Sequence, residues 1–526
     1  MDKMHPFLRT IAENPDDDNP RLVFSDWLEE NGHQDRAEFI RLQIELANMD
    51  PSEDGYAEKT ARMYRTGVFT NKATMPFLDH VPNSKCKIGF ERGFIAALIP
   101  NEMSDKSGFD LLPVQSLVVV SNLADKFKGF KKLKWLELAA APEYTPDKLL
   151  EILGPNGWFQ HLETLSLPHL DQACLQAGVI PQFELPKLRN LYLSSDFHTL
   201  GESDESNSSP DEDEFSLPEW VGWPENLVAN AIPNPKCPLE RFVWQSDIDT
   251  DSYHDGDFFW PTPTMETFLE RLKVHKLKQF EVAADYDDHE NGGEGVMAAP
   301  YEQNPLELVP SLERVTVKGN NLRLLEDSKR KLKMLRVYDR RFYGDSLFSL
   351  LSHPVCSELE ELHLEERSSW GSGPSGKLNN HFPHLKSLFL SGNLLENFTT
   401  CPFPKLLSLW GGNLKTVLSR KWPCLQQLAV GIHKPEDLKV LVDSDCFPNL
   451  TTLIFWGYFG EGKPDFSFLA KCKHMPFLSR VQIRDYPNQP YLQEFIINNG
   501  KLLPVRGDIM MDKLSPTTPF RVMVTF

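Results

Sequence analysis

One stretch of the sequence comes within a single residue of a phosphate-binding loop. The segment WGSGPSGKL fits the pattern G-x-x-x-x-G-K-[ST] from Gly371 to Lys377 and departs from it at Leu378. In that loop, backbone N–H groups at the start of a long helix hold the phosphates, and the serine or threonine after the lysine binds magnesium. Leucine has no oxygen for magnesium, and Pro383 leaves room for about one turn of helix. We therefore expect a surface loop, no ATP binding and no cofactor.

Other patterns that carry chemistry are also incomplete. Neither G-x-S-x-G nor H-E-x-x-H occurs. The stretch DIDTDSYHDGDF, residues 247–258, begins like a calcium loop with aspartates at alternate positions. However, Ser252 replaces the required glycine and Phe258 replaces the bidentate glutamate. The eight cysteines form no C-x-x-C pair, so a zinc site is unsupported. The sequence predicts no metal site and no enzymatic activity.

The composition favours a large soluble protein. The chain has 526 residues, of which 40% are hydrophobic, and its formal net charge is −20. Such an acidic chain is an improbable partner for nucleic acid, because affinity for phosphates comes mainly from lysine and arginine. The beginning, MDKMHPFLRT, has no apolar run like that of a signal peptide, and no segment has 18 uninterrupted apolar residues. We expect a cytoplasmic protein without a membrane span.

A short phrase recurs from about residue 114 to residue 483 and organises most of the chain. It has apolar residues at its first, fourth and sixth positions, and its second half alternates as a half-buried strand should. About fourteen instances occur: VQSLVV, LKWLEL, LETLSL, LRNLYL, LERFVW, LKQFEV, LERVTV, LKMLRV, LEELHL, LKSLFL, LLSLWG, LQQLAV, LTTLIF and LSRVQI. One such unit cannot close a core alone, but stacked units bury a continuous one.

The recurring phrase resembles the leucine-rich repeat. Two units match the fuller pattern L-x-x-L-x-L-x-x-N-x-L with conservative swaps, and Asn320 and Asn393 hold its asparagine position. The resemblance implies an α/β fold, a solenoid of about fourteen units, in which that asparagine bonds the backbone where the strand turns away. Most units lack the asparagine, and Gly411 stands where the last strand leucine is expected. The repeats are therefore irregular.

The N-terminal segment has a different pattern. Residues 5–47 predict three short helices, the second capped by Asn19 with Pro20 at its first position. The phrases NPDDDNPRLVFSDWLEENG, residues 14–32, and RAEFIRLQ, residues 36–43, resemble the bacterial repeat-companion domain. That resemblance implies a helical cap commonly followed by leucine-rich repeats, and no enzymatic activity. The phrase FERGFIAALI, residues 90–99, resembles the strand that often follows this domain.

These signals divide the chain into four parts. They are a helical repeat-companion domain (1–50), a helical or irregular connector (51–88), a leucine-rich-repeat solenoid (89–499) and a C-terminal capping segment (500–526).

Charged residues of the N-terminal segment have a structural explanation. The acidic run at residues 16–18 favours the positive end of the following helix rather than a metal. Asp26 and Arg36 form either a catalytic pair or a packing salt bridge. The salt bridge is favoured because no histidine or nucleophile lies near them in the sequence.

Three acidic insertions account for nearly all of the net negative charge. Residues 196–214 contain eight acids, and residues 245–260 and 285–294 contain five each, all without lysine or arginine. They begin the insertions 196–236, 245–260 and 285–303, which follow consecutive repeat strands and should leave the same edge. The sequence leaves open whether they dock a basic partner or are disordered.

The outward strand positions predict a binding face, because side chains alternate across a strand. Late in the chain these positions hold Phe389, Trp410, Ala429 and Ile454, followed by Ser391, Gly412, Gly431 and Trp456. The equivalent positions nearer the middle hold a basic strip of Arg314, Lys318 and Arg336. Large apolar side chains among small ones suggest a shallow apolar depression that contacts a protein. Alternatively, the C-terminal segment from Gly500 to Phe526 covers it.

We interpret the protein as a non-enzymatic interaction module that recognises a macromolecular partner, a protein, through the concave face of the solenoid. Two alternatives remain open at this point. One is a regulatory or adaptor subunit of a bacterial signalling or defence complex, and the other is an enzyme with an unrecognised site.

The acidic segment from Gly201 to Glu214 should be dispensable for folding. Its composition cannot bury enough apolar surface to offset the entropy of ordering it. We expect a deletion of residues 201–214 to leave the melting temperature unchanged in calorimetry. A fall of more than a few degrees would show that the segment packs against the fold.

Overall fold

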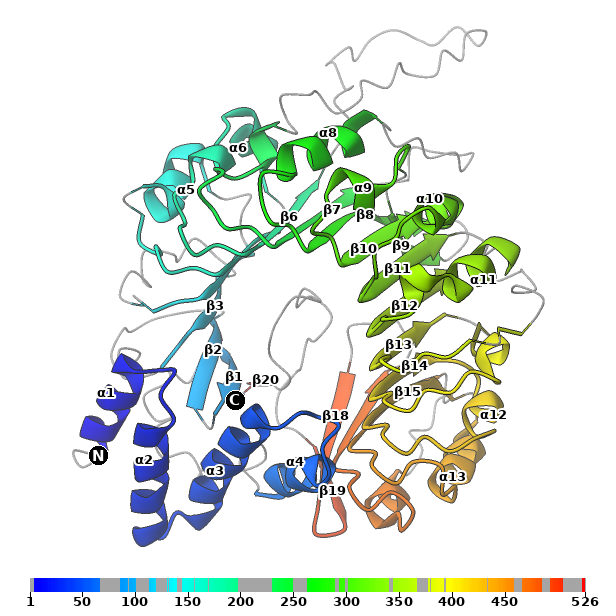
Figure 1. Ribbon diagram of the computed structural model, residues 1–526. Coiled ribbons are helices and arrows are strands. Elements are labelled where there is room, and N and C mark those ends of the chain that lie inside the picture. Colours follow the sequence, from blue (N-terminus) through cyan, green and yellow to red (C-terminus); the bar gives the residue numbers. More distant parts are fainter. Residues whose placement is uncertain are drawn as a thin grey trace, which may run out of the picture. The chain divides into compact units, whose positions relative to one another are not determined.

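The computed structural model (Figure 1) shows an α/β chain in two compact units. Unit 1 is Met1–Leu136, Lys331–Arg336 and Arg340–Phe526, and unit 2 is Glu137–Arg330 and Val337–Asp339. The structure describes residues 4–66, 86–92, 94–100, 113–119, 130, 132–139, 144–155, 157–168, 170–196, 229–248, 263–288, 293–298, 301–339, 344–366, 377–378, 380–391, 394–432, 434–457, 466–484, 492–504 and 523–525.

Four helices open unit 1. They are α1 (His5–Glu13), α2 (Asn19–Glu30), α3 (Gln34–Asn48) and α4 (Tyr56–Arg65). The three predicted helices are confirmed, and the fourth lies in the predicted connector. Pro20 stands in the first turn of α2, where its missing N–H costs no hydrogen bond. Gly32, with a φ of +84°, ends α2 in the left-handed conformation. Apolar side chains such as Phe24, Leu28 and Phe39 are fully buried between the helices and the strands that follow.

Each of the fourteen recurring phrases ends in a strand, as predicted. In unit 1 the later strands are β12 (Glu361–Glu366), β13 (Ser387–Leu390), β14 (Ser408–Gly411), β15 (Gln427–Gly431), β16 (Thr452–Trp456) and β17 (Arg480–Arg484). Each pairs in parallel with the next, without a register shift. Short helices fill the connections: α11 (Gly344–Ser352), η8 (Pro354–Cys356), η9 (Leu394–Phe398), α12 (Leu414–Val417), α13 (Pro435–Val442) and η10 (Ser467–Lys471).

Unit 2 repeats the same arrangement. Its strands are β5 (Thr164–Leu167), β6 (Asn190–Asp196), β7 (Arg241–Ile248), β8 (Gln279–Asp288), β9 (Gly293–Ala298) and β10 (Arg314–Lys318). The pairs β5–β6, β6–β7, β7–β8 and β8–β10 are parallel, whereas β9 runs antiparallel to β8. Its helices are α5 (Pro146–Leu153), α6 (Gln172–Gln176), η6 (Ile180–Gln182), α8 (Pro263–Leu272), α9 (Pro305–Leu308), η7 (Gly319–Asn321) and α10 (Leu322–Glu326). The unit boundaries fall within β4 (Trp135–Leu138) and β11 (Met334–Asp339).

One backbone hydrogen-bond pattern sets the register in both units. The carbonyl of Glu360, just before β12, accepts from the N–H groups of Lys386 (2.8 Å) and Ser387 (3.1 Å) at the start of β13. The same sharing of one carbonyl by two N–H groups recurs at each later step to β17 and at four steps in unit 2. The strand leucines therefore face one side together, and side chains such as Leu388, Leu409 and Leu428 are fully buried.

The two departures from the regular repeat have local explanations. At Gly411 the φ is +93°, and a Cβ there would lie 1.7 Å from the carbonyl oxygen of Leu390. Only glycine fits, so the missing leucine is a requirement of β14. The side chain of Asn320 lies outside what the structure describes. The neighbouring Asn321 does bond the backbone: it accepts from the N–H of Tyr301 (3.0 Å) and donates to the carbonyl of Tyr301 (2.6 Å). Asn393 lies outside the described residues.

The ends of the chain add antiparallel strands to unit 1. The phrase at residues 90–99 is not a single strand, because Arg92, with a φ of 50°, turns the chain between β1 (Cys86–Glu91) and β2 (Phe94–Pro100). In addition, β2 pairs with β3 (Ser116–Val119). Late in the chain, β18 (Leu492–Asn498) pairs with β17 and with β19 (Lys501–Pro504). The last strand, β20 (Met523–Thr525), pairs with β1.

These pairings place the described parts of the C-terminal segment. β19 extends the β17–β18 sheet and β20 lies beside β1, so neither lies on the face of β13–β16. Residues 505–522 are outside the described residues. Among the helices that the structure describes, none combines the length and the apolar character needed to cross a bilayer.

Replacing Gly411 with alanine should destabilise the protein by roughly 3 kcal/mol or more. A left-handed backbone costs a non-glycine residue about 1–2 kcal/mol, and here the methyl group also collides with the β13 backbone. Gly32→Ala is the matched control, because its φ is equally positive but a Cβ there meets nothing within 4 Å. Chemical denaturation of both variants tests this, and equal losses would contradict the steric explanation.

Candidate functional site

The near-match to a phosphate-binding loop has a structural role at its last residue. Leu378 is 2% exposed, and its N–H donates to the carbonyl of Asn397 at 2.8 Å. Its own carbonyl accepts from the Thr400 hydroxyl (2.7 Å) and the Cys401 thiol (3.1 Å). The described residues between Leu378 and β13 form no helix. Leu378 is therefore part of the core of its repeat. Residues 370–376 lie outside the described residues.

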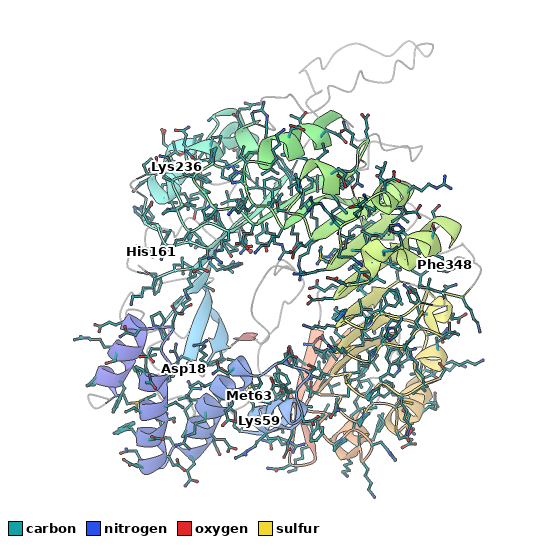
Figure 2. All side chains as sticks on the ribbon, viewed as in Figure 1. Asp18, Lys59, Met63, His161, Lys236 and Phe348 are labelled. Carbon is teal, nitrogen blue, oxygen red and sulfur yellow. The ribbon has the colours of Figure 1, made fainter. Side chains whose placement is uncertain are left out.

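The acidic run at residues 16–18 attaches the helices to the first strands. The Asp17 carboxylate accepts from the N–H of Asn19 at 3.0 Å, so the predicted helix-end role is confirmed for this residue. Asp16 instead binds the ammonium of Lys134 at 2.6 Å, and Asp18 binds the guanidinium of Arg92 at 3.1 Å. Burial alone would raise the pKa of Asp16, but Lys134, Gln115 and Arg92 together outweigh it and the pKa is lowered. Figure 2 shows Asp18 just before α2.

The predicted pairing of Asp26 with Arg36 is wrong. Asp26 binds Arg41 on α3 at 2.7 Å. The guanidinium of Arg36 is buried against the rings of Phe39, Phe90 and Phe94, 5.1–5.8 Å from their centroids. Burial lowers the pKa of Arg36 to about 9. Arg36 therefore packs in an aromatic cluster between the helices and the β1–β2 hairpin.

The acidic insertions leave one edge of unit 2, as predicted. The register places Asp196, Asp247 and Asp285 side by side near the ends of β6, β7 and β8. The third insertion is not simply a loop, because β8 and β9 pair from Ala283 to Asp288. Residues 197–228, 249–262 and 289–292 lie outside the described residues. Most of the calcium-like stretch is among them. Among the described residues, no group of acids, histidines and cysteines is able to hold a metal.

Three rings form a row on the outward face of β12, β13 and β14. The register pairs His363 with Phe389 and Phe389 with Trp410. The first two ring centroids lie 3.9 Å apart at 13°, and the next two lie 6.4 Å apart at 25°. All three side chains are half-buried, whereas the leucines that alternate with them along each strand are buried. The rings therefore lie on the more accessible face of these strands. The His363 ring also contacts the Glu365 carboxylate at 3.0 Å. We call this row the ring row.

Sequence reasoning missed His363, although it occupies the same place in its phrase, LEELHL, as Phe389 and Trp410 do in theirs. It found Phe389 and Trp410 by position and size. Trp456, two residues after Ile454 on β16, is also half-buried. Its indole nitrogen lies 3.1 Å from the position that a Cβ on Gly431 would occupy.

The predicted apolar depression does not extend along the whole face. The register continues the ring row through Ala429 and Ile454, but these residues are 0% and 2% exposed. Ile454 is therefore buried in this structure, and its role as a contact residue stays a prediction. Its neighbour in register is Gln482, which is also buried.

The basic strip is divided between the units. Arg314 and Lys318 belong to β10 in unit 2, whereas Arg336 on β11 belongs to unit 1. The carbonyl of Lys333 accepts from the N–H groups of Glu360 and Glu361, which gives Arg336 the position equivalent to His363. Of the three predicted basic residues, only Arg336 belongs to the same unit as the ring row.

Comparisons with known proteins leave the family open. No protein-family model matches the sequence, and no curated protein matches it. Among solved structures, the chain is similar to one in the crystal structure of the Rad7 and Elc1 complex in yeast. The identity is 14%, the TM-score is 0.32, and the match covers 68% of this chain and 83% of that chain. A likeness at this TM-score carries no argument about the role of this chain.

Replacing Leu378 with threonine completes the phosphate-loop pattern and should still create no ATP site. The change should instead destabilise the protein by about 3 kcal/mol, because it shortens a buried side chain and buries a hydroxyl. Lys377→Ala is the matched control, since Lys377 is exposed and adjacent. Thermal melts with and without Mg-ATP test both statements. Stabilisation of the threonine variant by ATP would contradict them.

Proposed function

We propose that this chain is a leucine-rich-repeat protein with an N-terminal helical segment of the repeat-companion type, and that it binds another protein. The fourteen phrases that end in strands, with the same carbonyl sharing recurring in both units, support the first part. The helices formed by residues 14–32 and 36–43 support the assignment of the N-terminal segment to the repeat-companion type. The ring row on β12–β14 is the observation that carries the binding role.

The ring row has the properties of a protein-binding surface. Its rings are partly accessible and stand on strands whose backbones are held on both sides, so little conformational freedom is lost on binding. Ser391, two residues after Phe389, has a small, half-buried side chain. Tryptophan is enriched among residues that dominate binding energy. We assign Trp410 as the centre of the contact, with Phe389 and His363 beside it.

We favour binding over catalysis because the residues whose type or motif suggested chemistry make structural contacts in the fold. Leu378 packs in the core, Asp16 and Asp18 attach the helices, and Arg36 is buried among rings. Each contact explains the residue without a substrate.

The Trp410→Ala variant tests this function. Partners captured by the full-length protein from its native host should be identified by mass spectrometry, and their affinity for the variant measured. We expect a loss of roughly 2 kcal/mol, about thirty-fold in Kd, with little loss of stability. Trp158→Ala is the matched control, because Trp158 is also half-buried but lies outside this face.

Two results would overturn the proposal. One is a Trp410→Ala variant that binds as well as the Trp158→Ala control. The other is a loss of stability of about 3 kcal/mol at Trp410, as for buried aromatic side chains, which would make the residue part of the core.

A further inference from the structure

Among the described residues, the N-terminal helices contact the strands of unit 1 in two places, and the first combines the ion pairs of Asp16 and Asp18 with aromatic packing. Phe24 on α2 packs against Phe94 on β2, and Phe39 on α3 packs against Phe90 on β1, with ring centroids 5.8 and 5.7 Å apart. All four rings are buried. Separating these surfaces would expose a large apolar area to water, so this attachment resists opening.

The second contact, between α4 and the last strands, is polar. Tyr64 at the end of α4 accepts a hydrogen bond from Arg480 on β17, and Arg480 donates to Glu494 on β18. Gln482 completes the cluster: with its carboxamide oxygen towards the guanidinium, it accepts from Arg480 Nη2 at 2.6 Å. The side chains of all four residues are buried. We call these four residues the polar cluster.

Further hydrogen bonds at this contact join a side chain to a backbone carbonyl across the boundary between the α4 region and the late strands. Arg65 donates to the carbonyl of Pro476 at 3.1 Å, and Asn498 donates to the carbonyl of Arg65 at 3.2 Å. Gln426, before β15, donates to the carbonyl of Pro51 in the turn that precedes α4. Figure 2 shows Lys59 and Met63 on α4, the helix that makes the contact.

The polar cluster lies on the same face as the ring row. The register runs from Trp410 through Ala429 and Ile454 to Gln482, and from Gln482 to Glu494. The far end of the face that carries the rings is therefore covered where α4 meets β17 and β18. In this state His363, Phe389 and Trp410 on β12–β14 and Trp456 on β16 are half-buried, whereas Ile454 and Gln482 are buried.

The chemistry of the polar cluster makes this contact easy to open. A buried ion pair gains little net free energy, because its attraction must first offset the loss of hydration of both charges. Burial alone would lower the pKa of Arg480, but Glu494 and Tyr64 raise it, so the guanidinium is charged. The second carboxylate oxygen of Glu494 is buried without a hydrogen-bond partner among the described residues. Opening would return these groups to water.

We infer that α4 is a reversible cover on the binding face. The contact with β17–β18 opens while the aromatic contact with β1–β2 holds, and opening extends the accessible face to Arg480, Gln482 and Glu494. This inference rests on the proposed function for its biological meaning, but the opening itself is a property of the isolated chain. A partner that binds the extended face must compete with α4.

Hydrogen–deuterium exchange of the full-length protein without a partner tests the cover. The double variant Tyr64→Phe, Arg65→Ala removes hydroxyl and guanidinium bonds across the contact and keeps the ring of residue 64. Arg62→Ala is the matched control, because Arg62 lies on the same helix but pairs with Glu38 on α3. We expect several-fold faster exchange in β16, β17 and β18 in the double variant only, with β1 and β2 unchanged.

Two exchange results would overturn the inference. Unchanged exchange in β16–β18 would show that α4 does not control access to this face. Faster exchange in β1 and β2 as well would show that the helices come away as a whole. Either result leaves the Trp410→Ala test of the proposed function untouched, so the two failures are distinguishable.

Partner affinity provides the second measurement. If α4 competes with the partner, the double variant should bind several-fold more tightly than the Arg62→Ala control. Equal affinities, together with faster exchange in β16–β18, would show that the contact opens without gating the partner and would overturn the proposed competition.

Discussion

The shared backbone carbonyl before each strand is the interaction on which the rest of the fold depends. Because one oxygen accepts from two successive N–H groups of the next repeat, each strand begins at the same point relative to its neighbour. A slip of one residue would move every strand side chain to the opposite face. The insertions and connections between strands differ widely in length, yet the register from β12 to β17 is unbroken. Register, rather than repeat length, is therefore what this fold conserves along the chain.

The ring row follows directly from that register. His363, Phe389 and Trp410 come from three separate phrases and meet only because their strands start together. Gly411 shows the cost of keeping the arrangement: the backbone of β14 comes so close to β13 that no side chain fits, and the expected leucine is absent. A conserved register thus constrains the core and positions the face at the same time.

Local patterns made the strands and the first helices predictable. The phrase repeats at short range, so its strands could be found without knowing what covers them. The outward face was harder, because burial there depends on residues distant in sequence. Ile454 occupies an outward position and is nevertheless buried, and Arg480 pairs with Tyr64, which lies more than four hundred residues earlier. The Asp26–Arg36 pairing failed similarly, since rings of β1 and β2 surround Arg36.

The two attachments of the N-terminal helices differ in how easily they open. Aromatic packing at Phe90 and Phe94 is favourable only while water is excluded, so its loss is costly at every degree of separation. The contact at Arg480 and Glu494 is different, because each group regains hydration as soon as water enters. A chain held by one contact of each kind will open at the polar one first. The register from Trp410 to Gln482 and Glu494 places that contact on the face that we propose binds a partner.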